Sequence, residues 1–334
     1  MSVMIKETAM SESEMIAAAE RALADIAKIR AGVGRVIFGQ ESVVERTLVA
    51  LLAGGHALLV GVPGLAKTKL VETLGIVLGL DSRRIQFTPD LMPSDILGSE
   101  VMEQDDQGKR SFRFISGPIF AQLLMADEIN RASPRTQSAL LQAMQEYHVT
   151  VAGERHDLPT PFHVLATQNP LEQEGTYPLP EAQLDRFLMQ VDILYPEIEA
   201  ERRILLETTG IEDARAQNVL DPERLKDVQH LIRRMPVSET VVEAILKLVR
   251  SARPGQGNAE TDKHVSWGPG PRASQALTLC ARARALYDGR LAPSIDDIRA
   301  LAEPVLQHRM ALTFAARAEG MTVRDVVARL VKDI

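Results

Sequence analysis

Gly61-Val-Pro-Gly-Leu-Ala-Lys67-Thr68 is the stretch that decides the fold of this 334-residue chain, because of what flanks it. The apolar run 57–60 before it predicts a buried strand, and residues 69–80 after it show apolar side chains at helical spacing. A strand, a glycine-containing loop and a helix in this order form a phosphate cradle, since the N–H groups of the loop and the helix N-terminus point at the anion. In such a cradle Lys67 reaches the β- and γ-phosphates, and Thr68 offers its hydroxyl to Mg²⁺.

One position of this loop departs from the common pattern, in which a glycine precedes the lysine. Ala66 stands at that position. An alanine adds only a methyl group, so we expect the loop to keep its shape with a negative backbone φ angle at Ala66.

Composition and charge limit the kind of protein. Lysine and arginine number 38 against 45 aspartate and glutamate, a formal net charge of −7, which argues against a surface devoted to nucleic acid. The single cysteine, Cys280, lies in an apolar helical pattern and is expected to be a buried structural thiol. Residues 1–14 carry charges throughout and predict no signal peptide, and no run of about 18 apolar residues predicts a membrane span. A cytoplasmic protein is expected.

Two styles of sequence follow each other along the chain. From about residue 35 to 195 short apolar runs alternate with helical patterns, which is typical of a parallel sheet covered by helices. From about residue 197 onward one helical pattern follows another. The predicted strands are 57–60, 84–87, 123–127, 163–167 and 187–191. The predicted helices are 17–31, 41–53, 69–78, 134–146, 181–185, 197–208, 222–235, 238–251, 271–287, 294–309 and 322–332. We therefore predict an α/β domain over residues 1–210 and an α-helical domain over residues 211–334.

Two stretches inside the α/β half interrupt this alternation. Residues 98–117 contain two β-prone segments around a turn at Gly108, whose freedom at positive φ suits a hairpin. Residues 147–162 contain a second pair of segments around Gly153. Both are predicted to be hairpin insertions, and surface decoration is the simple alternative for either one taken alone.

A set of polar residues at predicted strand ends supplies the other half of nucleotide chemistry. The apolar run 123–126 ends in Asp127, which would hold Mg²⁺ through water, and Glu128, which would orient and deprotonate the attacking water. Asn169 follows the next predicted strand, and its amide would sit between this carboxylate and the γ-phosphate. Such residues are common at strand ends, but behind a phosphate loop they indicate an ATPase site.

Two arginines complete the set. Arg186 lies at a helix-to-strand junction, and Arg272 opens a helix of the second half. A guanidinium at either place would neutralise charge that develops on the transferred phosphoryl group. Because Arg186 is expected on the side away from the cradle, we expect it to act on the nucleotide of a neighbouring subunit.

In this order the motifs closely resemble those of the MoxR family of AAA+ ATPases, over nearly the whole chain from about residue 15. The segments that carry the resemblance are Gly61–Thr68, Asp127-Glu-Ile-Asn-Arg-Ala132, Pro134-Arg-Thr-Gln-Ser-Ala-Leu-Leu141, Ala166-Thr-Gln-Asn-Pro170, Leu179-Pro-Glu-Ala-Gln-Leu-Asp-Arg-Phe187 and Gly268–Arg272. The resemblance implies a P-loop AAA+ domain with a parallel five-stranded sheet, followed by an all-α lid domain. An alanine at position 66 is no departure within this family.

The resemblance also implies roles for particular residues. Walker A is Gly61–Thr68, Walker B is Asp127 and Glu128, sensor 1 is Asn169, the arginine finger is Arg186 and sensor 2 is Arg272. Phe38-Gly-Gln40 would lie near the adenine, with ATP between the α/β domain and the lid, so that Arg272 senses the γ-phosphate from the lid. The residues expected to contact ATP and Mg²⁺ are Gly39, Gln40, Gly61, Val62, Pro63, Gly64, Leu65, Ala66, Lys67, Thr68, Lys69 and Asp127. Thr68 and Asp127 are the expected metal ligands, and Glu128, Asn169, Arg186 and Arg272 the expected catalytic residues.

At the level of assembly the resemblance implies a ring, usually a hexamer, with nucleotide at the subunit interfaces. The two hairpins would correspond to the helix-2 insert and the pre-sensor-1 insert, which line or approach a central pore. The function implied is a chaperone-like ATPase that remodels or matures protein complexes together with a protein bearing a von Willebrand factor A domain.

Two other functions stay open at this point. A nucleic-acid motor is possible because the wider clade includes helicases, but 4% aromatic residues and few basic residues at the hairpin tips (Lys109, Arg110 and Arg155) argue against it. A nucleotide-controlled scaffold with negligible turnover is the other, and the presence of Glu128, Asn169 and both arginines argues against that one.

Overall fold

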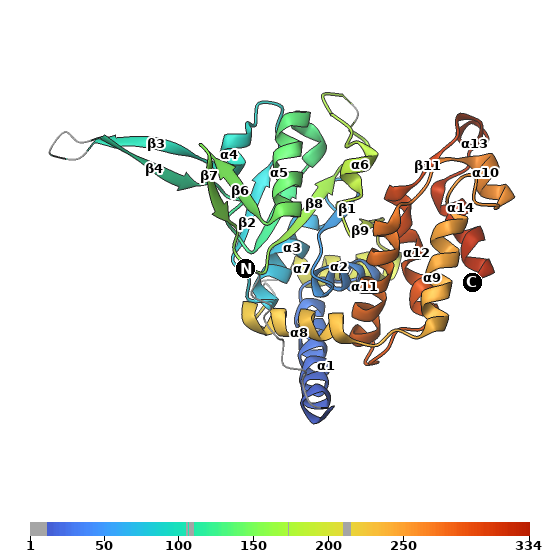
Figure 1. Ribbon diagram of the computed structural model, residues 1–334. Helices are drawn as coiled ribbons and strands as arrows, with labels where there is room; N and C mark the ends of the chain where they lie inside the picture. Colours follow the sequence, from blue (N-terminus) through green and yellow to red (C-terminus); the bar gives the residue numbers. More distant parts are fainter. Residues whose placement is uncertain (1–11, 105, 107–109, 173, 210–214) are drawn as a thin grey trace, which may run out of the picture.

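The computed structural model describes residues 12–104, 106, 110–172, 174–209 and 215–334. At its centre is a five-stranded parallel sheet with the strand order β2-β5-β8-β1-β9 (Figure 1). Its strands are β1 (Ala57–Val60), β2 (Ser82–Gln86), β5 (Leu123–Asp127), β8 (His163–Gln168) and β9 (Met189–Asp192). The five predicted strands are thereby confirmed, close to their expected bounds.

Helices cover both faces of this sheet, as a parallel sheet requires. Side chains alternate across a strand, so Leu59 and Leu165 face one layer while Leu58 and Val164 face the other. The first layer holds α1 (Glu12–Gly34), α2 (Glu41–Leu52) and α3 (Lys67–Val77), and the second holds α4 (Pro93–Leu97) and α5 (Pro134–Glu146). The core of the first layer continues without a break into the C-terminal helices.

The C-terminal part of the chain is helical, as predicted. Its elements, with the two helices that precede them, are α6 (Glu181–Leu184), α7 (Ile198–Thr208), α8 (Pro222–Arg234), α9 (Glu239–Ser251), α10 (Ala259–His264), α11 (Pro271–Tyr287), α12 (Ile295–Leu306), α13 (Phe314–Ala318) and α14 (Val323–Leu330). Short 3₁₀ helices are η1 (Ile129–Arg131), η2 (Gln307–Arg309) and η3 (Val331–Asp333). A small antiparallel pair, β10 (Val265–Trp267) with β11 (Ala311–Leu312), was not expected from the helical pattern. The predicted domain boundary at residues 210 and 211 lies outside the described residues.

The two predicted hairpins are present. β3 (Gly98–Gln104) pairs with β4 (Arg110–Ser116), and β6 (His148–Val151) pairs with β7 (Glu154–Asp157). The first hairpin extends far from the body of the molecule (Figure 1). The rings of Phe114 and His156 stack with centroids 3.9 Å apart, so the two hairpins contact each other. The predicted turn at Gly108, with Lys109, lies outside the described residues.

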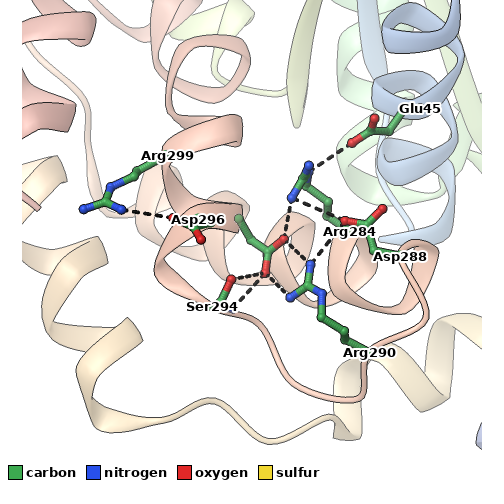
Figure 2. Close-up of polar contacts among 8 residues, drawn as sticks. Glu45, Arg284, Asp288, Arg290, Ser294, Asp296 and Arg299 are labelled. Carbon is green, nitrogen blue, oxygen red and sulfur yellow. Dashed lines mark hydrogen bonds and ion pairs between the residues drawn. The ribbon is translucent and has the colours of Figure 1, made fainter.

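A polar junction ties the C-terminal helices to the α/β domain (Figure 2). Arg284 of α11 donates from Nε to Glu45 of α2 at 3.0 Å and from a terminal nitrogen to Asp297 of α12 at 2.6 Å. Burial of Asp297 acts to raise its pKa, but hydrogen bonds from Arg290, Ser294 and Arg284 outweigh this and lower the pKa to about 2. Removing one partner of a buried ion pair destabilises a protein, because an unpaired charge is left buried. The network therefore stabilises the packing of α2, α11 and α12 against one another.

Two further predictions concern the whole chain. Cys280 is buried, as expected, and burial raises the pKa of its thiol to about 12, so it is not a reactive nucleophile. Over the part of the chain that the structure describes, no helix has the length and apolar character of a membrane span.

Candidate active site

The phosphate loop follows β1 at the carboxyl edge of the sheet. The backbone N–H of Gly61 donates to the carbonyl of Gln168 at 3.1 Å, which ties the start of the loop to the end of β8. Helix α3 begins at Lys67, with no side chain capping it and no acidic residue in its first turn. The first N–H groups of a helix lack partners within the helix, so this end suits an anion. A side-chain carbon at Gly64 would meet no atom within 4 Å, so the loop is open there.

The prediction of a negative φ at Ala66 is wrong. Ala66 has φ 56° and ψ 23°, in the left-handed region, and Gly64 nearby has φ 83°. An L-residue pays about 1–2 kcal/mol for this conformation, which a glycine adopts freely. The helix that follows holds it, because the N–H of Leu70 donates to the carbonyl of Ala66 at 2.9 Å. Ala66 thus adopts a conformation that the glycine of the common pattern would adopt without this cost.

The side chain of Lys67 folds back toward the start of the loop. Its ammonium donates to the carbonyl of Gly61 and, at 3.3 Å, to that of Val62. Partial burial lowers the pKa of Lys67, although the charges of Asp127, Glu128 and Glu172 act in the opposite direction. A half-buried cation whose hydrogen bonds go to neutral carbonyls suits a polyanionic ligand such as the phosphates of ATP.

Asp127 is held at the end of β5 by the strands on either side. It is buried, and its carboxylate accepts hydrogen bonds from Arg84 of β2 at 2.6 Å and from the Thr167 hydroxyl of β8 at 2.5 Å. Thr167 also accepts the backbone N–H of Glu128 at 2.8 Å. One hydroxyl therefore positions both acidic residues.

Glu128 has a strained backbone and an occupied carboxylate. Its φ is 55°, and residues held in this region often belong to functional sites. One carboxylate oxygen accepts from Gln86 at 2.7 Å and from Arg131 at 3.0 Å. Both donors contact Oε2, so these contacts hold the carboxylate in place at the end of β5.

Asn169 lies just beyond β8 and is buried. Its side-chain oxygen accepts the backbone N–H of Leu171 at 3.1 Å, so its carbonyl end shapes the turn. The nitrogen end is therefore the one that can donate to a water or a phosphate oxygen.

The oxygen atoms at this edge suit Mg²⁺. Thr68 is the second residue of α3, next to Lys67, and Asp127 is near enough for its charge to act on Lys67. Among the residues described, no group of three histidine, cysteine or acidic side chains is placed to hold a metal ion. An ion held by one hydroxyl and one carboxylate takes its remaining ligands from phosphate and water, which is how Mg²⁺ commonly binds.

The expected base-binding segment also reaches the loop. Gln40 donates from Nε2 to the carbonyl of Leu65 at 3.2 Å, while its own side-chain oxygen is buried without a hydrogen-bond partner. A buried acceptor without a donor fits an amine or hydroxyl group of a nucleoside. Gly39 has φ 67°, and a side-chain carbon there would lie 2.1 Å from Cβ of Ala200, so only glycine lets α7 pack here. Pro63 and Lys69 are exposed on the loop and on α3.

Arg186 lies at the opposite edge of the sheet. It precedes β9, whose first residue Met189 is the register partner of Ala57 at the start of β1, whereas the loop follows the end of β1. A strand rises about 3.3 Å per residue, so more than about 10 Å separates the two edges. Arg186 therefore lies too far away to contact phosphate groups on the loop of its own chain, as predicted from its place in the sequence.

Arg272 lies beside Arg186 and not beside the loop. It forms an ion pair with Asp185 at 3.7 Å, and its charge, after the larger effect of burial, lowers the pKa of Arg186. Arg272 therefore lies near Asp185 and Arg186 in this conformation, and its role as sensor 2 stays a prediction.

A cavity of about 270 Å³ joins these two arginines. Among its described lining residues are four arginines, Arg186, Arg233, Arg272 and Arg309, and one carboxylate, Asp185. Asp185 is already paired with Arg309 at 2.7 Å. The cavity therefore carries an excess of positive charge and suits an anion.

Sequence reasoning missed several residues that position the carboxylates. Arg84 and Gln86 alternate along β2 and so share a face, and Gln86 is the register partner of Asp127. The alternation is visible in the sequence, but the pairing of β2 with β5 is not. Arg131, which contacts Glu128, and Glu172, whose charge acts on Lys67, were also not predicted to belong to the site.

Comparisons with known proteins agree with this geometry. The sequence model described as the ATPase family associated with various cellular activities (AAA) matches residues 56–189, and that of the AAA lid domain matches residues 258–330. The chain is 42% identical over 304 residues to Chaperone MoxR1 of Mycobacterium tuberculosis, covering 90% of this chain and 80% of that protein. It is 30% identical over 308 residues to Protein MoxR of Methylorubrum extorquens, covering 86% and 87% of the two chains.

The chain belongs to the MoxR family of AAA+ ATPases. It is also 40% identical to the protein YeaC of Bacillus subtilis, covering 90% of this chain and 92% of that one. A crystal structure from Cytophaga hutchinsonii, assigned as an ATPase, superposes with a TM-score of 0.89 at 36% identity, covering 96% of this chain and 98% of that one. The AAA+ fold with its helical lid, predicted from the motifs, is confirmed.

Proposed function

We propose that this MoxR-family protein hydrolyses ATP at the interfaces between subunits of a ring, most simply a hexamer. One observation carries the proposal. Lys67, Asp127 and Glu128 lie at the carboxyl edge of the sheet, whereas Arg186 and Arg272 lie at the other edge. Each subunit therefore holds two incomplete halves of a site. A head-to-tail ring brings one half of each subunit against the other half of the next.

The residues of the loop edge divide the work between binding and proton transfer. Lys67 and the first N–H groups of α3 hold the phosphates. Mg²⁺, held by Thr68 and by Asp127 through water, supplies positive charge at the phosphate oxygens. Glu128, held by Gln86 and Arg131, takes a proton from the attacking water, and Asn169 positions that water.

The residues of the arginine edge complete the site of the next subunit. Arg186 stabilises charge that develops on the transferred phosphoryl group, and Arg272 beside it contacts the same phosphate. Since Arg272 is carried by α11, which is tied to α12 and α2, a change at the neighbour's phosphate reaches the helical lid.

Mixed assemblies test this proposal. Arg186→Ala subunits keep their loop and Lys67→Ala subunits keep their arginine, so each preparation alone should lose turnover. Mixing them should restore part of the ATPase activity, because a Lys67→Ala subunit supplies Arg186 to an intact loop. Arg317→Ala, a change on the exposed surface of α13, should leave activity unchanged. Absence of any rescue in mixed rings of confirmed composition would contradict the composite site.

We further propose that the ring acts as a chaperone-like remodeller of protein complexes with a von Willebrand factor A partner, in the cytoplasm. The family membership and the relative named Chaperone MoxR1 support this role. The projecting β3–β4 hairpin, in contact with β6–β7, provides two linked elements that can reach a client. Turnover should rise with the partner and client and stay unchanged with DNA or RNA. Stimulation by nucleic acid alone would favour a motor, and negligible turnover of the assembled ring would favour a scaffold.

A further inference from the structure

A second cavity lies against the phosphate loop, on the side of β9. It has a volume of about 360 Å³, in the range of small-ligand sites. Gly61, Val62 and Leu65 of the loop form one wall, the end of β9 with Asp192 and Tyr195 forms another, and Arg324 of α14 closes it from the lid. Unlike the cavity at Arg186 and Arg272, this one belongs to the loop of its own chain.

The order of the strands decides which part of a nucleotide this cavity takes. The sheet runs β5-β8-β1-β9, with the loop following β1. Asp127 and Glu128 lie at the end of β5 and Asn169 follows β8, so in the proposed function the γ-phosphate lies toward these two strands. The cavity lies on the other side of β1. The nucleoside is the end of ATP opposite the γ-phosphate, so it points toward the cavity.

Arg324 is held at the wall of this cavity by two carboxylates from different elements. It forms ion pairs with Asp192 at the end of β9 and with Glu303 of α12, the latter at 3.0 Å. Its side chain is 42% exposed, while that of Asp192 is 14% exposed. The guanidinium has five N–H donors, so these two contacts leave donors for a ligand in the cavity.

We propose that Arg324 contacts the nucleoside end of ATP bound to the loop of its own chain, and so makes α14 the part of the lid that responds to nucleotide in the same subunit. The inference rests on the proposed binding of ATP at Lys67. It gives the two lid arginines opposite assignments, Arg324 to the subunit's own nucleotide and Arg272 to the neighbour's. Asp192 is the positioning residue that holds the guanidinium in place.

The contact predicts a specific pattern of affinities. A hydrogen bond from a charged donor is worth about 1.5–3 kcal/mol, so Arg324→Ala should weaken ATP binding at least about tenfold. ATP and ADP share the nucleoside, so the affinity for ADP should fall by the same factor. Inorganic tripolyphosphate, which has no nucleoside, should bind as before.

Calorimetric titrations of the full-length protein measure this pattern. A Glu128→Gln background prevents turnover, and tripolyphosphate is measured by competition with ATP. Asp192→Asn keeps the guanidinium of Arg324 but removes the charge that holds it in place, so ATP affinity should fall, by less than in Arg324→Ala. Arg329→Ala, on the same helix and paired with Glu260 at 2.7 Å, is the matched control and should change nothing.

Three outcomes overturn the inference. If Arg324→Ala leaves ATP and ADP affinity unchanged, the residue makes no contact. If Asp192→Asn and Arg324→Ala weaken binding alike, the ion pair is merely structural. If Arg324→Ala lowers the affinity for tripolyphosphate as much as the affinity for ATP, the contact is not with the nucleoside. Failure of the proposed function itself is distinguished by Lys67→Ala, which must abolish binding of all three ligands whatever Arg324 does.

Discussion

The two edges of the central sheet differ in how their charges are held. At the loop edge, Asp127 has Arg84 and Thr167 as partners, and Glu128 has Gln86 and Arg131. At the other edge, four arginines line one cavity around a single described carboxylate. The loop edge is thus a nearly balanced set of groups that suits a nucleotide, while among the residues described the arginine edge carries more positive than negative charge.

This difference explains why assembly and catalysis belong together in the proposed function. Burying like charges in one cavity is unfavourable unless an anion joins them. The phosphates on the loop of a neighbouring subunit supply that anion, so nucleotide binding and ring formation stabilise each other.

The largest expected effect comes from the arginine edge. Arg186→Ala should lower kcat of the assembled ring by about 10³–10⁵, the range known for arginines that stabilise phosphoryl transfer from a neighbour. ATP binding to the subunit's own loop should persist. Steady-state ATPase rates with a parallel binding titration check both. Loss of ATP binding together with turnover would mean that Arg186 serves its own loop, and the comparison of the two edges would fail.

The next effect concerns the loop edge. Glu128→Gln keeps the shape of the side chain but removes the base, so turnover should fall by about 10²–10⁴ while ATP binding is retained. Single-turnover measurements on saturated protein separate the two. Gln86→Ala should have a milder effect in the same assay, because it removes only one donor to Glu128. Full activity of Glu128→Gln would contradict its assignment as the base.

The third prediction concerns pH and the buried histidines behind the arginine cavity. Burial, with the charge of His163, lowers the pKa of His56 to about 3, and burial lowers that of His163 to about 4. Both are neutral when folded, whereas the unfolded chain takes up their protons as pH falls below about 6.5. The free energy of unfolding should therefore fall with decreasing pH between about 6.5 and 4, by up to about 1.4 kcal/mol per pH unit for each histidine.

Urea unfolding at several pH values measures this dependence. The window lies above the range in which Asp297 contributes, since the pKa of that carboxyl is lowered to about 2 and its stabilisation is lost only below its ordinary value of 3.8. A flat free energy of unfolding between pH 6.5 and 4.5 would show that these histidines are not buried as described.

The smallest expected effect lies in the loop. Ala66→Gly removes the strain of a left-handed alanine and should stabilise the folded protein by up to about 1 kcal/mol, reduced by the greater freedom of glycine when unfolded. ATP binding should be retained. Thermal unfolding without nucleotide is the measurement, and a destabilisation of several degrees would indicate that the methyl group of Ala66 makes a packing contact that glycine loses.

Most of the fold could be predicted from local features of the sequence. Short apolar runs predicted β1, β5 and β8, which are almost entirely buried, whereas β2 is mostly exposed and has only one buried residue. Pro134–Glu146 and Pro271–Tyr287 were predicted at their observed bounds, since proline at the first turn marks a helix start. The β10–β11 pair was missed because strands of two or three residues show no periodicity.

For the site, the sequence by itself determined which groups exist: the loop with Lys67 and Thr68, and the carboxylates at the end of β5. The residues of each motif are close together in the sequence, so their spacing along the chain identifies them. The tertiary structure alone decided the positive φ of Ala66, the hydrogen bond of Gln86 to Glu128, and the placement of Arg272 beside Arg186 and Arg324 beside the loop. The reason is physical: strand order and helix packing bring together residues that are 42 or more positions apart, and no local pattern records which edge of the sheet each one reaches.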